Sequence, residues 1–233
     1  MPQHTIKRFD EELDKLKELV LAMGGLVERA IGNAVQSMLE QDEALAKATI
    51  EQDKEINALE IECDEMTRDI LVRRQPAAGD LRFILGIIKV VTDLERMGDL
   101  AAGISKAMLN AQSNPPKNFS NLDIMGEKVQ KQVKRTLNAL SRGDTDLSMK
   151  VIGKDQGIDK LYKRMYREML TYMLEDPREI SSSIIVSNVA KNLERISDHA
   201  TNISEMVVYI ARGHDIRHVE HEAAEKMLSG DDS

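Results

Sequence analysis

The stretch LERMGDLAAGI at Leu94–Ile104 returns 99 residues later as LERISDHATNI at Leu193–Ile203. In each copy the apolar residues recur at intervals of three and four, the spacing of one face of an α-helix. Each copy also carries Glu-Arg-x-x-Asp, so two carboxylates four residues apart lie on one helix face, away from the apolar seam. A repeat of this length predicts a chain built from two similar halves.

Apolar periodicity on either side of these stretches predicts three helices in each half. In the first half they span about 9–38, 45–73 and 80–111, separated by a polar break at Gln41 and Asp42 and by a turn at Pro76. In the second half they span about 122–140, 144–174 and 177–210, and the last one opens at Asp176-Pro177-Arg178-Glu179. We therefore predict an all-α protein made of two tandem antiparallel three-helix bundles related by an internal repeat.

The boundary between the halves is predicted where the periodicity stops. Residues 113–121 contain two prolines and no apolar repeat, which is typical of a linker. The predicted domains are a first bundle over 1–112, the linker 113–121, and a second bundle over 122–212. The polar tail 213–233 is expected to be partly disordered or to form a short docking helix.

Composition supports helices and excludes several classes of protein. Of the 233 residues 42% are hydrophobic but only 3% are aromatic, which suits helices packed through aliphatic side chains. A net charge of -8 argues against a nucleic-acid partner. The single cysteine, Cys63, excludes an intrachain disulfide and falls on an apolar seam, so we expect a small core residue. With no bilayer-spanning apolar run and no signal peptide, the protein is expected in the cytoplasm.

Antiparallel hairpins bring partners to the two acidic motifs. About the turn at Pro76, positions 53 and 57 lie opposite 99 and 95, and about Pro177, positions 155 and 159 lie opposite 198 and 194. Each hairpin is therefore expected to gather four oxygen-bearing side chains on one patch, roughly 30 Å from its turn. These candidate metal ligands are Asp53, Asn57, Glu95 and Asp99 in the first half and Asp155, Asp159, Glu194 and Asp198 in the second.

A bound cation would offset the repulsion among these carboxylates. An all-oxygen shell suits magnesium, calcium, manganese or oxidised iron. A buried ferritin-like di-iron centre is disfavoured, because no histidine follows a glutamate by three residues. The alternative is that salt bridges with Arg96 and Arg195 neutralise the patches. Because Asn57 lacks a charge, the first site is predicted to bind metal more weakly than the second, and equal occupancy under limiting metal would contradict this.

Three arginines at the tip of the first hairpin form a second candidate site. Arg73, Arg74 and Arg82 flank the turn at Pro76 and offer bidentate donors to an acidic partner surface or an anion. The alternative interpretation is capping of helix ends and solvation.

Several stretches along nearly the whole chain resemble the PhoU family of bacterial phosphate-uptake regulators. Together these motifs are highly specific, although each is weak alone. They are Met23-Gly24-Gly25-Leu26-Val27-Glu28, Asp53-Lys54-Glu55-Ile56-Asn57, Arg74-Gln75-Pro76 with Asp80-Leu81-Arg82, Leu94-Glu95-Arg96-Met97-Gly98-Asp99, Thr171-Tyr172-Met173-Leu174-Glu175-Asp176 and Glu194-Arg195-Ile196-Ser197-Asp198.

The resemblance implies a fold, metal ions and partners. It implies two tandem three-helix bundles, usually as a homodimer, whose acidic motifs hold multinuclear iron or zinc clusters. It also implies an adaptor that contacts the ATPase of a phosphate ABC transporter and the sensory domain of a phosphate-responsive histidine kinase, holding the kinase inhibitory when phosphate is plentiful. Contact with the membrane would then occur only through these partners, and no organic cofactor is implied.

The sequence itself favours a regulator over an enzyme. It contains no Gly-rich phosphate loop, no nucleophile elbow and no Cys/His pair. Two alternatives remain open, a metal-dependent phosphohydrolase whose carboxylates hold ions that activate water, and a purely structural helical scaffold with an acidic surface.

Overall fold

The computed structural model describes residues 2–76, 78–111, 116, 119, 121–217, 219 and 221–230. Over these residues it contains α-helices and one 3-10 turn, and no strand. None of the helices it describes combines the length and the apolar character needed to cross a bilayer. The elements are α1 (Pro2–Glu40), α2 (Glu43–Arg74), α3 (Ala78–Asn110), α4 (Leu122–Arg142), α5 (Thr145–Ile152), α6 (Asp155–Glu175), the 3-10 turn η1 (Pro177–Glu179), α7 (Ile180–Arg212) and α8 (His221–Gly230).

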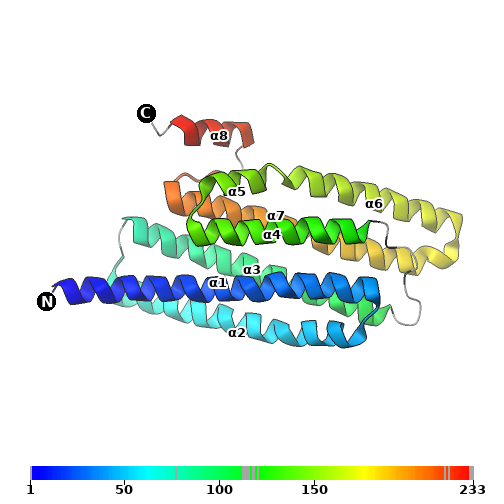
Figure 1. Ribbon diagram of the computed structural model, residues 1–233, viewed down its shortest axis with the longest axis horizontal. Helices are drawn as coiled ribbons and strands as arrows, with labels where there is room; N and C mark the ends of the chain where they lie inside the picture. The colour runs from blue at the N-terminus through cyan, green and yellow to red at the C-terminus, as the bar shows by residue number, and fades with distance from the viewer. Residues whose placement is uncertain are drawn as a thin grey trace.

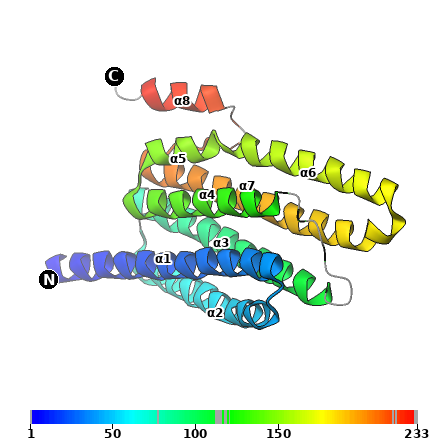
Figure 2. The same ribbon diagram turned by 45° about the vertical axis from the view of Figure 1, so that its right-hand side comes forward.

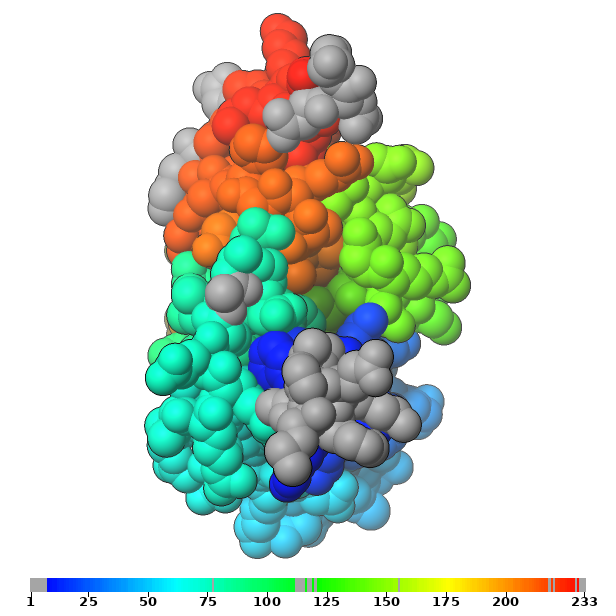
Figure 3. Space-filling model, turned by 90° about the vertical axis from the view of Figure 1, so that its left-hand side faces the viewer, coloured from blue at the N-terminus to red at the C-terminus, as the bar shows by residue number. Residues whose placement is uncertain are grey.

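Two antiparallel bundles lie side by side, with their helices running along the long axis of the molecule (Figure 1). The first consists of α1, α2 and α3, and the second of α4, the α5–α6 pair and α7. The bundles meet where α3 packs against α7 and α1 against α4. Seen along the long axis, the start of α3 lies beside the end of α7 (Figure 3). The predicted fold class is thus confirmed.

One predicted helix is divided in two. Instead of running from 144 to 174, it ends as α5 at Ile152 and restarts as α6 at Asp155. Gly153 and Gly157 flank the restart and weaken helix formation, and the backbone N–H of Lys154 donates to Val151 O at 3.0 Å in a tight turn. Beyond this break, α6 and α7 extend together past the start of α4 (Figure 2).

Aspartates start three elements where the sequence indicated breaks. Asp42 and Asp144 accept hydrogen bonds from the backbone N–H three residues later, which caps α2 and α5. Asp176 caps the 3-10 turn, whose first residue is proline, and α7 follows directly. Of the predicted linker 113–121, only residues 116, 119 and 121 are described, so the domain boundaries stay predictions.

The α1–α4 contact shows the internal repeat at atomic scale. A Cβ at Gly24 would lie 2.5 Å from Leu137 Cδ2, and a Cβ at Gly126 would lie 2.6 Å from Val35 Cγ1. The two glycines are 102 residues apart (24 and 126), and so are their partners (35 and 137). The contacts are therefore reciprocal, and Gly24 serves close packing within a continuous helix rather than a bend.

A large apolar core runs through both bundles, and a smaller cluster of Met149, Val208, Ile216 and Ala224 lies beside it. Cys63 is 1% exposed, as predicted for a core residue, and burial raises its pKa to about 11. The described part of the tail contains the short helix α8, whose first residue, His221, lies with Nε2 3.0 Å from Met149 O of α5.

Candidate metal centre

Three carboxylates of the second bundle converge on one point of its surface. Atoms of Asp159 on α6 and of Glu194 and Asp198 on α7 all lie within 4.8 Å of one another. Among the described residues, this is the one group of three acidic, histidine or cysteine side chains with that spacing. The fourth candidate, Asp155, is the first residue of α6, and its side chain lies outside the described part. The antiparallel hairpin thus brings the described candidates together.

Packing of α7 determines where these carboxylates point. Leu193 and Ile196 are fully buried, which turns Glu194 and Asp198 toward the surface beside α6. Ser197, between them in sequence, is also buried and donates its hydroxyl to Gln132 Oε1 on α4 at 2.7 Å. The rotation of α7 about its axis is therefore fixed from the opposite side.

A lysine already interacts with this acidic group. Lys191 Nζ lies 2.6 Å from Glu194 Oε2 and 5.2 Å from the centre of the Tyr162 ring. The hydrogen bond to Glu194 raises the pKa of Lys191, although burial partly opposes this shift. The sequence suggested Arg195 as a neutralising cation. The ion pair that the described residues show for Glu194 is with Lys191, three residues earlier on the same helix face.

In the first bundle, Asp53 and Asn57 on α2 face the Glu95–Asp99 motif on α3. Asn57 Nδ2 donates to Asp53 Oδ2 at 3.5 Å, and a Cβ at Gly98 would lie 3.3 Å from Asp53 Oδ1. The absence of a side chain at Gly98 thus lets α2 approach α3 closely. Asp53 Oδ1 and Asn57 Oδ1 are both buried, and neither has a hydrogen-bond partner among the described residues.

Burial and mutual repulsion raise the pKa values of three carboxylates of the first bundle, Asp53, Glu60 and Glu95. Desolvation is the largest cause for Asp53 and for Glu95, followed in both by the charge of Asp99. The pKa of Glu60 is raised by burial and then by the charges of Asp64 and Asp99. A bound cation would favour the ionised form of these three carboxylates.

Glu60 is a site residue that the sequence reasoning missed. Its four-residue spacing from Asp64 is typical of an ordinary solvated helix face, yet its charge acts on Glu95 across the hairpin. The signal was present, since position 60 lies about one helical turn beyond Asn57, and the mirror relation places it opposite position 92, about one turn from Glu95. In the second bundle Tyr162 occupies the equivalent position, 102 residues later.

Both patches fit a hard cation by the chemistry of their donors. Each offers carboxylate or amide oxygens without thiolate or imidazole, the set that magnesium, calcium, manganese and oxidised iron prefer. Asp53 Oδ1 and Asn57 Oδ1 are buried without a hydrogen-bond partner among the described residues, and a bound cation would satisfy both oxygens. Metal binding at either patch stays a prediction.

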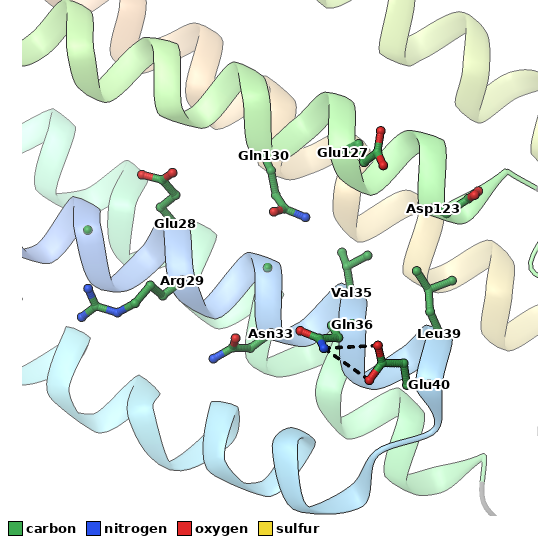
Figure 4. A pocket seen from close by; sticks show the side chains of 12 residues that line it. Glu28, Arg29, Asn33, Val35, Gln36, Leu39, Glu40, Asp123, Glu127 and Gln130 are labelled. Carbon is green, nitrogen blue, oxygen red and sulfur yellow. Dashed lines mark hydrogen bonds between the residues drawn. The ribbon is translucent and has the colours of Figure 1, made fainter.

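A groove between α1 and α4 is a further feature that the sequence did not reveal. It encloses about 600 Å³, and Gly25 and Gly32 of α1 are among its lining residues. The labelled side chains around it come from α1 and α4 (Figure 4). Gln36 Nε2 donates to both carboxylate oxygens of Glu40 at its edge, at 3.2 and 3.3 Å. Four acidic side chains line it, namely Glu28, Glu40, Asp123 and Glu127. Two glycines seven residues apart on one helix face would have been the sequence signal for this hollow.

Each of the three candidate docking arginines has an intramolecular partner. Arg73 Nη2 lies 2.9 Å from Asp69 Oδ2, and Arg82 Nε donates to Ile210 O near the end of α7 at 3.1 Å. Arg74 binds Glu12 on α1 through two hydrogen bonds, of 2.8 and 2.7 Å. These contacts secure helix ends, and docking of a partner at this tip stays a prediction.

Replacing Arg74 with alanine is expected to lower the free energy of unfolding, because a bidentate, half-buried contact between α2 and α1 is lost. The hydrogen bond from Arg74 lowers the pKa of Glu12 below 4.5. The contribution of the Arg74–Glu12 contact to the free energy of unfolding is therefore complete above about pH 4.5, and it disappears as pH falls through the native pKa of Glu12. Urea unfolding of wild type and variant should show a difference in the free energy of unfolding that shrinks in acid.

The control variant is Arg73→Ala, which removes an exposed ion pair and should lower the free energy of unfolding by at most about 0.5 kcal/mol at any pH. Equal losses for the two variants would contradict the prediction.

Comparison with known proteins agrees with the two-bundle geometry. The family model described as "PhoU domain" matches the chain twice, at residues 20–108 and 122–207. A curated relative from Pseudomonas putida, named phosphate-specific transport system accessory protein PhoU homolog, is 42% identical over 94% of this chain and 86% of its own length.

Two solved structures share the fold over most of the chain. The crystal structure of PhoU from Pseudomonas aeruginosa superposes with a TM-score of 0.86 at 41% identity, covering 88% of this chain and 100% of that one. The phosphate transport system regulatory protein PhoU from Streptococcus pneumoniae superposes with a TM-score of 0.82 at 29% identity, covering 89% and 98%.

Proposed function

The chain belongs to the PhoU family, and from that premise we propose that it regulates phosphate uptake as a cytoplasmic adaptor, without catalysing a reaction. The observation that carries the proposal is the match of the family to both bundles, with relatives whose names place them in phosphate-specific transport. Similarity extends over almost the full length of the chain and of its relatives, so the proposal concerns the whole protein rather than one module.

The proposed partners are the ATPase of a phosphate ABC transporter and a phosphate-sensing histidine kinase. The elongated pair of bundles presents a separate long face from each half, which suits a protein that contacts two others (Figure 1). By binding both, the chain would repress the phosphate-starvation response when phosphate is plentiful. We further propose that it acts as a homodimer and reaches the membrane only through the transporter.

Metal ions are proposed to stabilise the two acidic patches. The first would hold a cation with Asp53, Asn57, Glu95 and Asp99, and Glu60 adds a further carboxylate. The second would use Asp159, Glu194 and Asp198, with Asp155 beside them. Iron, zinc, manganese and magnesium are the candidate ions. A bound ion would neutralise charge and tie the two helices of each hairpin together.

A deletion strain tests the regulatory role. Removing the gene from its host is expected to leave a phosphate-starvation promoter active in phosphate-rich medium, and the intact chain should restore repression. Purified chain should also bind the transporter ATPase and the cytoplasmic part of the kinase in pull-downs. Normal repression in the deletion strain, together with no binding to either protein, would refute the adaptor role.

A further inference from the structure

A basic pocket lies between α4 and the junction of α5 with α6. It has a volume of about 590 Å³ and is open to solvent. Five cationic side chains line it, three from α4, one from the N-cap residue of α6 and one from within α6. They are Lys128, Lys131, Arg135, Lys154 and Lys160, and we call this cavity the basic pocket.

The cations of the basic pocket have no acidic partners among the described residues. None of the five forms an ion pair there, and no acidic side chain of the described part lines the cavity. Elsewhere on the same chain basic side chains do pair, as Lys47 does with Glu43 and Lys54 with Glu51. Five unpaired cations around one cavity repel one another, and a bound anion would relieve that cost. Their concentration is notable in a chain of net charge -8.

Backbone groups add to the attraction for an anion. The 21-residue helix α6 begins at the pocket, and its N-cap residue, Lys154, makes no side-chain capping hydrogen bond. The first N–H groups of a helix favour negative charge where they lack partners within the helix. One of these groups in α6, the N–H of Gly157, already donates to Lys154 O at 3.0 Å. Gly157 lines the cavity, and a Cβ built there would meet nothing within 4 Å, so the space reaches the helix backbone.

The basic pocket is not part of the framework that the two halves share. The residues 102 positions earlier, which occupy the equivalent places in the first bundle, retain only one of the five cations. They are Leu26, Arg29, Asn33, Gln52 and Ala58. The fold of a bundle therefore does not require these charges, which points to a role specific to the second bundle.

We propose that the basic pocket binds an anion composed of two or more linked phosphate groups. One phosphate carries about two negative charges near neutral pH, which would leave most of five cations without a counter-charge. The volume lies in the range of small-molecule sites, and a concave site suits a compact anion better than a protein surface. No aromatic side chain lines the cavity among the described residues, so it lacks a platform for a nucleobase. An inorganic oligophosphate matches these properties better than a nucleotide.

Calorimetric titration of the full chain with sodium tripolyphosphate tests this inference. We expect saturable binding that weakens as salt is added, since the attraction is electrostatic. Lys131→Ala combined with Lys160→Ala should weaken binding by about tenfold or more, because two charge-assisted contacts are lost. The matched control is Lys134→Ala combined with Lys163→Ala, which removes two exposed lysines from the same helices outside the basic pocket. The control should stay within about twofold of wild type.

Other outcomes distinguish the alternatives. Absence of binding at millimolar tripolyphosphate, or equal weakening in the pocket and control variants, would overturn the inference. Orthophosphate binding as tightly as tripolyphosphate would overturn the requirement for linked phosphates. Tighter binding of a hexaglutamate peptide, with the same dependence on Lys131 and Lys160, would instead assign the basic pocket to an acidic protein segment.

One further variant separates anion binding from removal of metal by the oligophosphate. Glu194→Ala combined with Asp198→Ala should bind tripolyphosphate as wild type does, and loss of binding there would show that the anion is held through a metal. The inference goes beyond the proposed regulatory function and does not rest on it. A pull-down without partner binding would therefore leave the anion result intact.

Discussion

Replacing Glu194 and Asp198 together with alanine is expected to weaken metal binding at the second bundle by about 100-fold or more. Loss of supporting groups around a metal site already costs about 10–100-fold in affinity, and this variant removes two direct ligands. Only Asp159 would remain of the three carboxylates within 4.8 Å. Elemental analysis of protein purified without an affinity tag, from iron- and zinc-replete medium, should show metal in the wild type and a clear decrease in the variant.

A matched control distinguishes a metal site from general acidity. Glu51→Ala with Glu55→Ala removes two exposed carboxylates at the same four-residue spacing on α2. Glu51 is paired with Lys54, and neither glutamate belongs to the converging group. This control should retain the metal content of the wild type. Equal metal content in all three proteins, or none in any, would leave the acidic patch as a surface for partners rather than ions.

Lys191 affects the predicted binding of metal at the second bundle. Its ammonium group lies 2.6 Å from Glu194 Oε2 and neutralises part of the charge that a cation would otherwise meet. A metal ion must therefore displace it, so metal uptake and the lysine contact compete. In the part of the first patch that the structure describes, no lysine forms an ion pair with Asp53 or Glu95, although the charge of Lys106 acts on Asp53. This patch contains Asn57 in place of a carboxylate and has Glu60 in addition. The two halves reach similar charge by different residues.

Periodicity and the repeat were sufficient to predict the main architecture. Residues such as Leu94 and Leu193 recur with helical spacing, and each is fully buried in the core. The division of the helix between Ile152 and Asp155 was not predicted, because the apolar pattern continues across it and only two glycines mark the turn. Local propensity decided the backbone there, although the pattern suggested one helix.

Helix geometry was sufficient to predict which positions of the candidate site lie opposite each other, but not which side chains make contact there. Symmetry about Pro177 placed Asp159 opposite Glu194, because helical rise is uniform along an antiparallel pair. The same reasoning overlooked Glu60 and the contact of Lys191 with Glu194, since both depend on how side chains bend across a groove. The basic pocket was also missed, because its cations come from α4 and from the α5–α6 junction and α6, and a sequence pattern does not fix how these helices face each other.

Replacing Gly126 with valine is expected to lower the free energy of unfolding by about 3 kcal/mol and the melting temperature by about 10 °C. A Cβ at this position would lie 2.6 Å from Val35 Cγ1 and 3.2 Å from its Cγ2. Val35 is branched at Cβ and 4% exposed, so it cannot rotate away, and α1 must move off α4. Chemical and thermal unfolding of the purified variant would measure both quantities.

The reciprocal construction of the α1–α4 contact supplies both the control and the rescue. Gly25→Val adds the same side chain to α1 at a position where a Cβ meets nothing within 4 Å, and should change stability by less than about 0.5 kcal/mol. Adding Val35→Ala to Gly126→Val removes the two methyl groups in conflict and should recover about 1–2 kcal/mol relative to additivity. If the changes in the free energy of unfolding for the two substitutions simply add, Gly126 and Val35 are not in direct contact between the bundles. Coupling would establish that the small residues of the repeat set the distance between the bundles, and hence the spacing of the two acidic patches along the molecule.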